Sequence, residues 1–426
     1  MLELADTFSS TVGEGARSMV NILSLDGGGT WALLQARALA ALYPGESGHR
    51  ILSRFDYAFA NSGGSIVLGG LLLDLMPVEI ERHFTEAKLR GSLYRPSPLL
   101  SAAFFRIFKA GAKYSTPAKQ KALDKIFGSL PLASLPHAGG QVTKVVIVAF
   151  DYVRSRAFFF RSPDPTRFPT IRNMTIASAV HASTTAPVLY FDRPAEFMVD
   201  LAYPDVSSMP INMQFWDGGV TGLNNPVAAA VAEAISASVS SSEIAALSIG
   251  TGSVLKSNNW SHQGGDPAQL APERKKLTPI GDVAALAEAV VDDPPDFASF
   301  LAHTMTGGHA PTGTETVTDG RIVRMSPLVL GDFVAGKWQR PAWNQPPLRS
   351  GGLDLFERLQ NLGMDAVAQQ EVDDIGKLGD AWLGGDAKNQ PIRGNFFQDA
   401  ASGYHAEIGH LSFAAARAAA ARLGLL

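Results

Sequence analysis

The sequence predicts an α/β fold in which helices flank a mostly parallel central β-sheet on both faces. Twice within the first 75 residues, an apolar strand-like segment runs into a glycine-rich turn and then into an apolar helix-like segment. A third indication is the apolar, β-branched segment at residues 144–150, which is typical of a strand covered on both faces.

The expected elements follow from these patterns in chain order. We expect strands over residues 19–25, 55–61, 144–150 and 245–249. We expect helices over residues 31–42, 65–75, 117–127, 227–237, 279–291, 353–383 and 410–425, and loops over residues 256–278 and 344–352. Residues 19–255 are expected to form one catalytic core, and residues 256–426 to form mostly helical additions that pack on it.

Composition excludes several classes of protein. With 426 residues, 46% of them hydrophobic, the chain can bury a large core, so wholesale disorder is excluded. Its formal charge of -4 provides no field for a nucleic acid polymer, so none is expected as a partner. The absence of cysteine excludes disulfides, a thiolate nucleophile and cysteine-ligated metals, and it suits a cytoplasmic location.

No membrane-spanning or secretory segment is predicted. Residues 1–10 carry two acidic residues and no basic one, unlike a signal peptide. The longest apolar stretch, at residues 66–73, is interrupted by Gly69 and Gly70 and falls short of the roughly 20 residues that a spanning helix needs. We therefore expect a soluble protein, at most peripheral at a membrane.

The first glycine-rich turn consists of Asp26, Gly27, Gly28, Gly29 and Thr30. Backbone N–H groups at the end of a strand, together with the positive end of the following helix, can bind negative charge. The same residues also fit a dinucleotide-binding turn, a phosphate loop of actin-like sugar kinases, or a turn without a ligand. The turn alone does not decide between these.

The second turn places Ser62 between an apolar strand and an apolar helix, with the small residues Ala60 and Gly64 on either side. This is the spacing of a nucleophile elbow, in which the strand and the helix pack closely and push the serine outward. Tight packing without catalysis is the alternative interpretation.

A third motif supplies a candidate base for the serine. Asp217 is followed by Gly218 and Gly219, which leave its carboxylate on an open turn, and the dipeptide Asn224–Asn225 lies just beyond. A surface turn aspartate is the alternative for this motif taken alone. Three glycine motifs of this kind in this order are nevertheless unusual.

Together the motifs resemble those of patatin-like phospholipases and acyl hydrolases, over roughly residues 19–255. The resemblance implies a three-layer fold and hydrolysis of lipid or other acyl esters through an acyl-enzyme. Ser62 would be the nucleophile and Asp217 the base, with backbone N–H groups around Gly27, Gly28 and Gly29 forming the oxyanion hole. Asp26, Thr30, Ala60, Gly64, Gly218 and Gly219 would flank these residues. Neither a metal nor a cofactor is implied, and the lipid substrate implies transient contact with a membrane surface.

Two residues depart from the family pattern. Trp31 stands where the family usually has a basic residue, and Ala60 stands where the elbow usually begins with glycine. A catalytically weak binding or regulatory relative is therefore a competing hypothesis, and an ATP-dependent sugar kinase is a second one. We expect Trp31 to pack beneath the turn, the alternative being that it faces the site and influences selectivity. We expect His181 to be a packed or surface histidine without a catalytic role. Either the apolar helical segments near the elbow or the aromatic stretch at residues 99–108 could touch the bilayer. The sequence predicts neither the lipid headgroup nor the oligomeric state.

Overall fold

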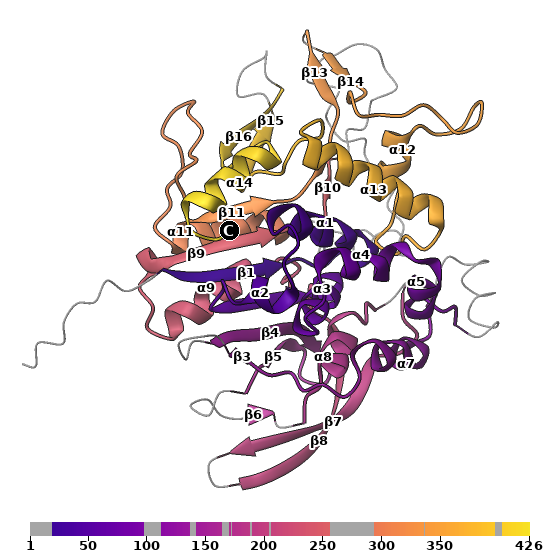
Figure 1. Ribbon diagram of the computed structural model, residues 1–426, viewed down its shortest axis with the longest axis vertical. Helices are drawn as coiled ribbons and strands as arrows, with labels where there is room; N and C mark the ends of the chain where they lie inside the picture. The colour runs from indigo at the N-terminus through magenta and orange to yellow at the C-terminus, as the bar shows by residue number, and fades with distance from the viewer. Residues whose placement is uncertain are drawn as a thin grey trace, which may run out of the picture.

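A central β-sheet organises the molecule, for which a computed structural model describes residues 19–97, 112–136, 142–163, 170–171, 173–187, 190–203, 206–255, 294–335, 337–396 and 403–426. The strand order is β11-β9-β1-β2-β4-β8-β7-β6, and β3 and β5 also pair with β4 (Figure 1). The pairs from β11 to β4 are parallel, whereas β8, β7 and β6 continue the sheet in antiparallel fashion. The predicted mostly parallel α/β sheet is confirmed.

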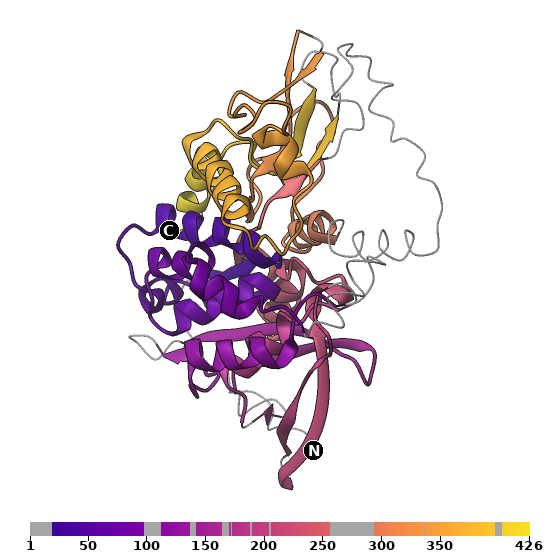
Figure 2. The ribbon, with the colours of Figure 1, turned by 90° about the vertical axis from the view of Figure 1, so that its right-hand side faces the viewer.

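The strands of this sheet include all four that the sequence predicts. They are β1 (Val20–Leu25), β2 (Tyr57–Asn61), β3 (Leu135–Pro136), β4 (Val142–Asp151), β5 (Arg156–Arg161), β6 (Thr170–Ile171), β7 (Ala195–Tyr203), β8 (Val206–Asp217), β9 (Ile244–Ile249) and β11 (Ile322–Met325). Strands β7 and β8 form a long antiparallel hairpin at one end of the molecule (Figure 2). The sequence patterns did not predict this hairpin.

Helices lie on both faces of the sheet. They are α1 (Leu33–Leu42), α2 (Gly48–Leu52), α3 (Ser62–Leu72), α4 (Pro77–Thr85), α5 (Ala87–Leu93), α7 (Thr116–Phe127), α8 (Ile176–Ser183), α9 (Val227–Ser236), α11 (Pro294–Met305), α12 (Leu355–Gln360), α13 (Gln369–Gly384) and α14 (Phe413–Arg422). The helix expected over residues 353–383 is two helices, α12 and α13, separated by a loop at residues 361–368. The expected helix at 279–291, the loop at 256–278 and the aromatic stretch at 99–108 lie outside the described residues.

Alternating side chains of the strands enter two separate cores, which gives the fold its three layers. In β1, Ile22 packs in a cluster with residues of α9 and α11, whereas Leu23 packs in a second cluster with α1, α3 and α8. In β2, Phe59 belongs to the first cluster and Ala60 to the second. This period of two is what a strand buried on both faces requires.

The segment after residue 255 contributes to the sheet as well as covering it. Its strand β11 pairs in parallel with β9, and its helix α13 packs against α1. It also contains the short strands β12 (Leu328–Val329), β13 (Asp332–Val334), β14 (Lys337–Gln339), β15 (Arg393–Phe396) and β16 (Tyr404–Ile408), of which β12 pairs with β10 (Ser253–Val254). These orange and yellow elements lie at the end of the molecule opposite the β7–β8 hairpin (Figure 2).

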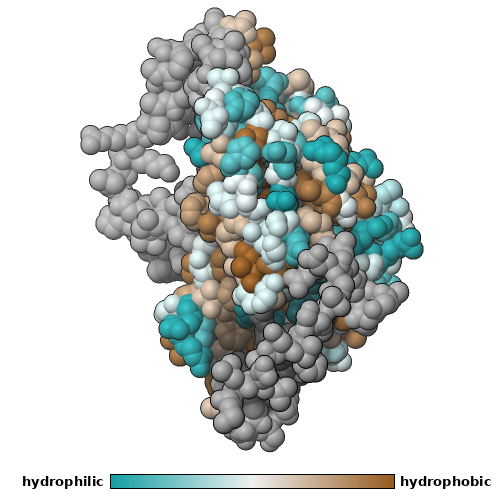
Figure 3. All heavy atoms as spheres, turned by 90° about the vertical axis from the view of Figure 1, so that its left-hand side faces the viewer, coloured by the Kyte–Doolittle hydropathy of each residue, from teal (hydrophilic) through white to brown (hydrophobic). Residues whose placement is uncertain are grey.

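None of the described helices is both long enough and apolar enough to cross a bilayer. On the face shown in Figure 3, hydrophobic and hydrophilic side chains are interspersed wherever the surface is not covered by grey atoms.

Candidate active site

The turn at Ser62 is a strained elbow. Strand β2 ends at Asn61 and helix α3 begins at Ser62 itself, whose φ of 46° is rare for a residue with a side chain. A Cβ atom built on Gly63 would lie 2.5 Å from the carbonyl oxygen of Gly29, and one on Gly64 would lie 2.6 Å from that of Asp26. The glycines after Ser62 are therefore needed for the elbow to pack on the first glycine turn. Ala60 is fully buried and has no positive φ, so its methyl group is tolerated.

Asp217 lies beside this elbow because of the order of the strands. Strand β4 separates β2 from β8 and pairs Val148 with Asn61 and Ala149 with Asp217. Asp217 ends β8 and caps the short 3₁₀ helix Gly218–Thr221, accepting a hydrogen bond of 2.8 Å from the N–H of Gly219. The side-chain amide of Asn61 donates to the same oxygen, Asp217 Oδ1, at 3.3 Å.

Burial and hydrogen bonding shift the pKa of the Asp217 carboxyl in opposite directions. Burial, with only 6% of the residue exposed, raises its pKa above the ordinary value. Hydrogen bonds from the Ser62 hydroxyl and the Gly219 N–H oppose that rise. Ser62 therefore lies near the Asp217 carboxyl, and it is partly exposed, so a substrate can approach it.

The first glycine turn lies directly against Ser62. A Cβ atom on Gly27 would fall 2.9 Å from the Ser62 Cβ. Gly28 and Gly29 have φ values of 154° and 56°, and a side chain on either would collide with Thr251 or with the Met364 carbonyl. Close contact on both sides explains why the turn consists of glycines.

The three glycines differ in whether their N–H groups are free. The Gly27 N–H donates to the Asn224 carbonyl at 2.8 Å, so in this structure it cannot also bind a ligand oxygen. For Gly28 and Gly29, the described residues offer no hydrogen-bond partner to either N–H group. Of the three predicted oxyanion donors, the N–H groups of Gly28 and Gly29 thus have no partner among the described residues, whereas the Gly27 N–H already has one.

No group of three or more histidine, aspartate and glutamate side chains within the described ranges is arranged to hold a metal ion. His181 is buried at the end of α8, and burial lowers its pKa well below the ordinary value. Of the two places expected for it, packed or at the surface, it takes the packed one and is neutral.

The segment that holds these turns is similar to a known protein family. Residues 23–231 match the model of the family described as patatin-like phospholipase, and this segment includes all three glycine motifs. Residues 23–231 form a patatin-like phospholipase domain. This membership supports lipid acyl hydrolase activity in general.

Two further comparisons add little to the family match. A search of curated proteins finds no matching sequence. The crystal structure of VipD from Legionella pneumophila aligns at 11% identity over 86% of this chain and 67% of that chain, with a TM-score of 0.30. An alignment with this TM-score does not establish a common fold.

The end of α8 supports both predicted catalytic residues of the patatin-like domain. The N–H of Ser62 donates to Ser183 Oγ at 2.8 Å, and the N–H of Asp217 donates to the Thr185 carbonyl at 2.8 Å. Behind this corner lies Lys119 of α7, whose Nζ reaches Thr184 Oγ1 at 3.0 Å and Thr185 Oγ1 at 2.7 Å. The sequence patterns do not single out Lys119, because a lysine in an amphipathic helix usually lies at the surface.

Trp31 packs against the base of the glycine turn of the patatin-like domain. Only 6% of it is exposed, and its indole N–H donates to the Gly363 carbonyl at 3.0 Å. The next residue, Met364, accepts the N–H of Thr30 at 2.9 Å. The loop between α12 and α13 therefore covers the turn, and Trp31 is buried against it.

Proposed function

We propose that this protein is a serine esterase that hydrolyses carboxylic ester bonds of lipids, with Ser62 as the nucleophile and Asp217 as the general base. The observation that carries the proposal is the strained elbow that presents Ser62 next to the buried Asp217 carboxyl, to which the preceding residue Asn61 donates a hydrogen bond. The family membership of residues 23–231 supports the lipid as the source of the ester.

The chemistry needs only these two side chains and water. Ser62 Oγ attacks the ester carbonyl carbon while its proton passes to Asp217, forming a tetrahedral oxyanion. As the C–O bond to the alcohol breaks, Asp217 returns that proton to the leaving oxygen, and the acyl group stays on Ser62. Water then attacks the acyl carbon and gives a proton to Asp217. When the Ser62 C–O bond breaks, Asp217 passes the proton to Ser62 and the fatty acid leaves.

The N–H groups of Gly28 and Gly29 are the proposed oxyanion donors, because neither has another partner among the described residues. Donors fixed before the reaction stabilise developing charge without reorganisation, and losing one typically costs a factor of about 10² to 10³ in rate. We assign no oxyanion contact to Gly27, since its N–H is already bonded to Asn224.

We further propose that the enzyme reaches its lipid by transient contact with a membrane surface. An ester in a bilayer lies at the interface, so an enzyme that acts on it must bind there at least briefly. Flotation with liposomes should show weak, reversible binding. Binding that resists carbonate extraction would contradict transient contact.

The test of the function is hydrolysis of a mixture of phospholipids, galactolipids and neutral esters, followed by mass spectrometry of the products. Wild type should release fatty acids from at least one class, and Ser62→Ala should release none. Ser236→Ala, which removes a surface hydroxyl on α9, serves as the control and should retain full activity. Undiminished hydrolysis by Ser62→Ala would reject the proposed nucleophile.

A further inference from the structure

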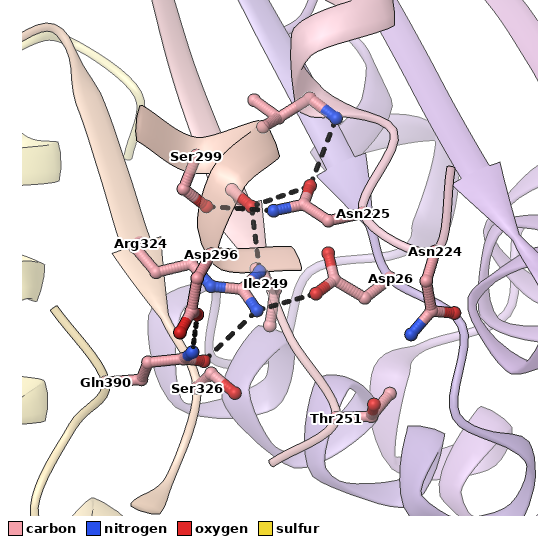
Figure 4. Close-up of polar contacts among 12 residues, drawn as sticks. Asp26, Asn224, Asn225, Ile249, Thr251, Asp296, Ser299, Arg324, Ser326 and Gln390 are labelled. Carbon is pink, nitrogen blue, oxygen red and sulfur yellow. Dashed lines mark hydrogen bonds and ion pairs between the residues drawn. The ribbon is translucent and has the colours of Figure 1, made fainter. Parts of the chain in front are cut away.

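Arg324 lies beneath the glycine turn although it comes from outside the patatin-like domain. It belongs to β11, and one of its guanidinium nitrogens lies 2.6 Å from Asp26 Oδ2 (Figure 4). Both side chains are 3% exposed. Asp26 is the first residue of the turn, so the ion pair ties the turn to a strand about 300 residues further along the chain.

Both terminal nitrogens of the guanidinium have further partners, whereas its buried Nε has none among the described residues. Its second terminal nitrogen donates to Ser248 Oγ of β9 at 3.0 Å, and the nitrogen facing Asp26 also donates to Gln390 Oε1 at 3.3 Å. Gln390 in turn donates to Asp296 of α11 (Figure 4). A Cβ atom on Gly250 would lie 2.6 Å from the guanidinium, so that glycine leaves the space Arg324 occupies.

The glycine turn depends on contacts of this kind to hold its shape. Glycines with positive φ, as at Gly28 and Gly29, give a chain little stiffness of its own. Asp26 is held by its N–H, which donates to the Ile249 carbonyl at 3.1 Å, and by its carbonyl, which accepts from Gln35 at 2.9 Å. The ion pair with Arg324 fixes its side chain in addition.

We propose that Arg324 is a positioning residue of the active site: through Asp26 it holds the N–H groups of Gly28 and Gly29 in the orientation that receives the oxyanion. This inference rests on the proposed esterase function. It makes residues beyond the patatin-like domain necessary for full activity. It also places a cation at the start of the turn.

Steady-state kinetics test the positioning role. Arg324→Met and Asp26→Asn should each lower kcat by about ten- to a hundredfold with little change in KM, because a misplaced donor affects the transition state more than substrate binding. Arg324→Lys should recover part of the rate. The double variant should be no slower than the slower single variant, since both remove one interaction. The matched control is Arg393→Met, which breaks an ion pair of 2.6 Å with Glu407 in the hairpin of β15 and β16.

Hydrogen exchange separates this inference from the esterase proposal, because it does not require turnover. The amides of Asp26, Gly27 and Thr30 are hydrogen-bonded, so they should exchange faster in Arg324→Met and Asp26→Asn than in wild type or Arg393→Met. If Arg324→Met does not fold, the near-isosteric Asp26→Asn alone tests whether the ion pair holds the turn. If wild type hydrolyses no ester but the two variants still exchange these amides faster than wild type does, the esterase is rejected and the anchoring role is retained. Unchanged exchange together with unchanged kcat in Asp26→Asn would overturn the inference.

Discussion

The side-chain amide of Asn61 donates a hydrogen bond to Asp217 Oδ1, although the two residues lie on strands that are separated by β4. Asn61 also directly precedes Ser62, and its amide reaches Asn224 Oδ1 at 3.4 Å. One buried side chain therefore connects the elbow, the aspartate turn and the Asn224–Asn225 segment.

Replacing Asn61 should disturb Asp217 more than it disturbs the fold. The Asn61 amide lowers the pKa of the Asp217 carboxyl, so Asn61→Ala should raise that pKa further. We expect kcat to fall by about tenfold, and the acidic limb of the pH–rate profile to move to higher pH. An unshifted profile would show that the amide does not act on the carboxylate.

The pH dependence of the wild-type enzyme should report Asp217 directly. A general base works only when ionised, so kcat/KM should rise with pH, with its midpoint above the value of about 4 usual for aspartate. Because burial raises the pKa in the folded state, the stability of wild type relative to Asp217→Asn should fall as pH rises from the unfolded to the folded pKa. Urea unfolding of both proteins between pH 4 and pH 8 measures this difference. If the free energy of unfolding of wild type instead increases relative to that of Asp217→Asn as the pH rises, the pKa of Asp217 is not raised.

Lys119 should contribute to both stability and catalysis. In wild type the Lys119 ammonium donates to the Thr184 and Thr185 hydroxyls and to the His181 carbonyl. Lys119→Met removes these hydrogen bonds, and the free energy of unfolding should fall by about 1–3 kcal/mol. Because Thr185 also holds the N–H of Asp217, kcat should fall as well. Urea unfolding and kinetics on one preparation test both effects. Loss of stability with unchanged kcat would confine Lys119 to the fold.

Trp31 is expected to support the loop rather than to select the substrate. Trp31→Arg should lower stability, since it places a charge in a site that is 6% exposed, while leaving the ratio of phospholipid to neutral-ester rates unchanged. Trp31→Phe, which loses the bond to Gly363 and part of the buried ring volume, should cost about 1–3 kcal/mol. A folded Trp31→Arg protein with a raised ratio would instead assign Trp31 to selectivity.

The parts of the fold that are encoded locally could be predicted from the sequence. Strands β1, β2, β4 and β9 are short apolar runs bounded by turn residues, and each formed within a few residues of its expected place. The elbow and the Asp217 turn could be predicted because the glycines in the sequence mark positions where a side chain would collide with neighbouring atoms. The family model confirms the predicted family over residues 23–231.

Contacts between distant segments could not be predicted in the same way. Nothing in the sequence around Arg324 distinguishes it from a surface arginine, because its burial depends on the pairing of β11 with β9 and on Asp26. Lys119 is hidden for a similar reason, since its acceptors come from residues 181–185. The bond between Gly27 and Asn224 likewise depends on how two turns meet.

Covalent labelling of the native protein with a fluorophosphonate probe, followed by peptide mass spectrometry, tests the central claim most directly. The reagent phosphonylates an activated serine and expels fluoride, so the adduct identifies the nucleophile. We expect one adduct, on Ser62, that is absent in Ser62→Ala and forms far more slowly in Asp217→Asn. An adduct on a different serine, or labelling of Ser62 at an undiminished rate in Asp217→Asn, would contradict the proposed pair.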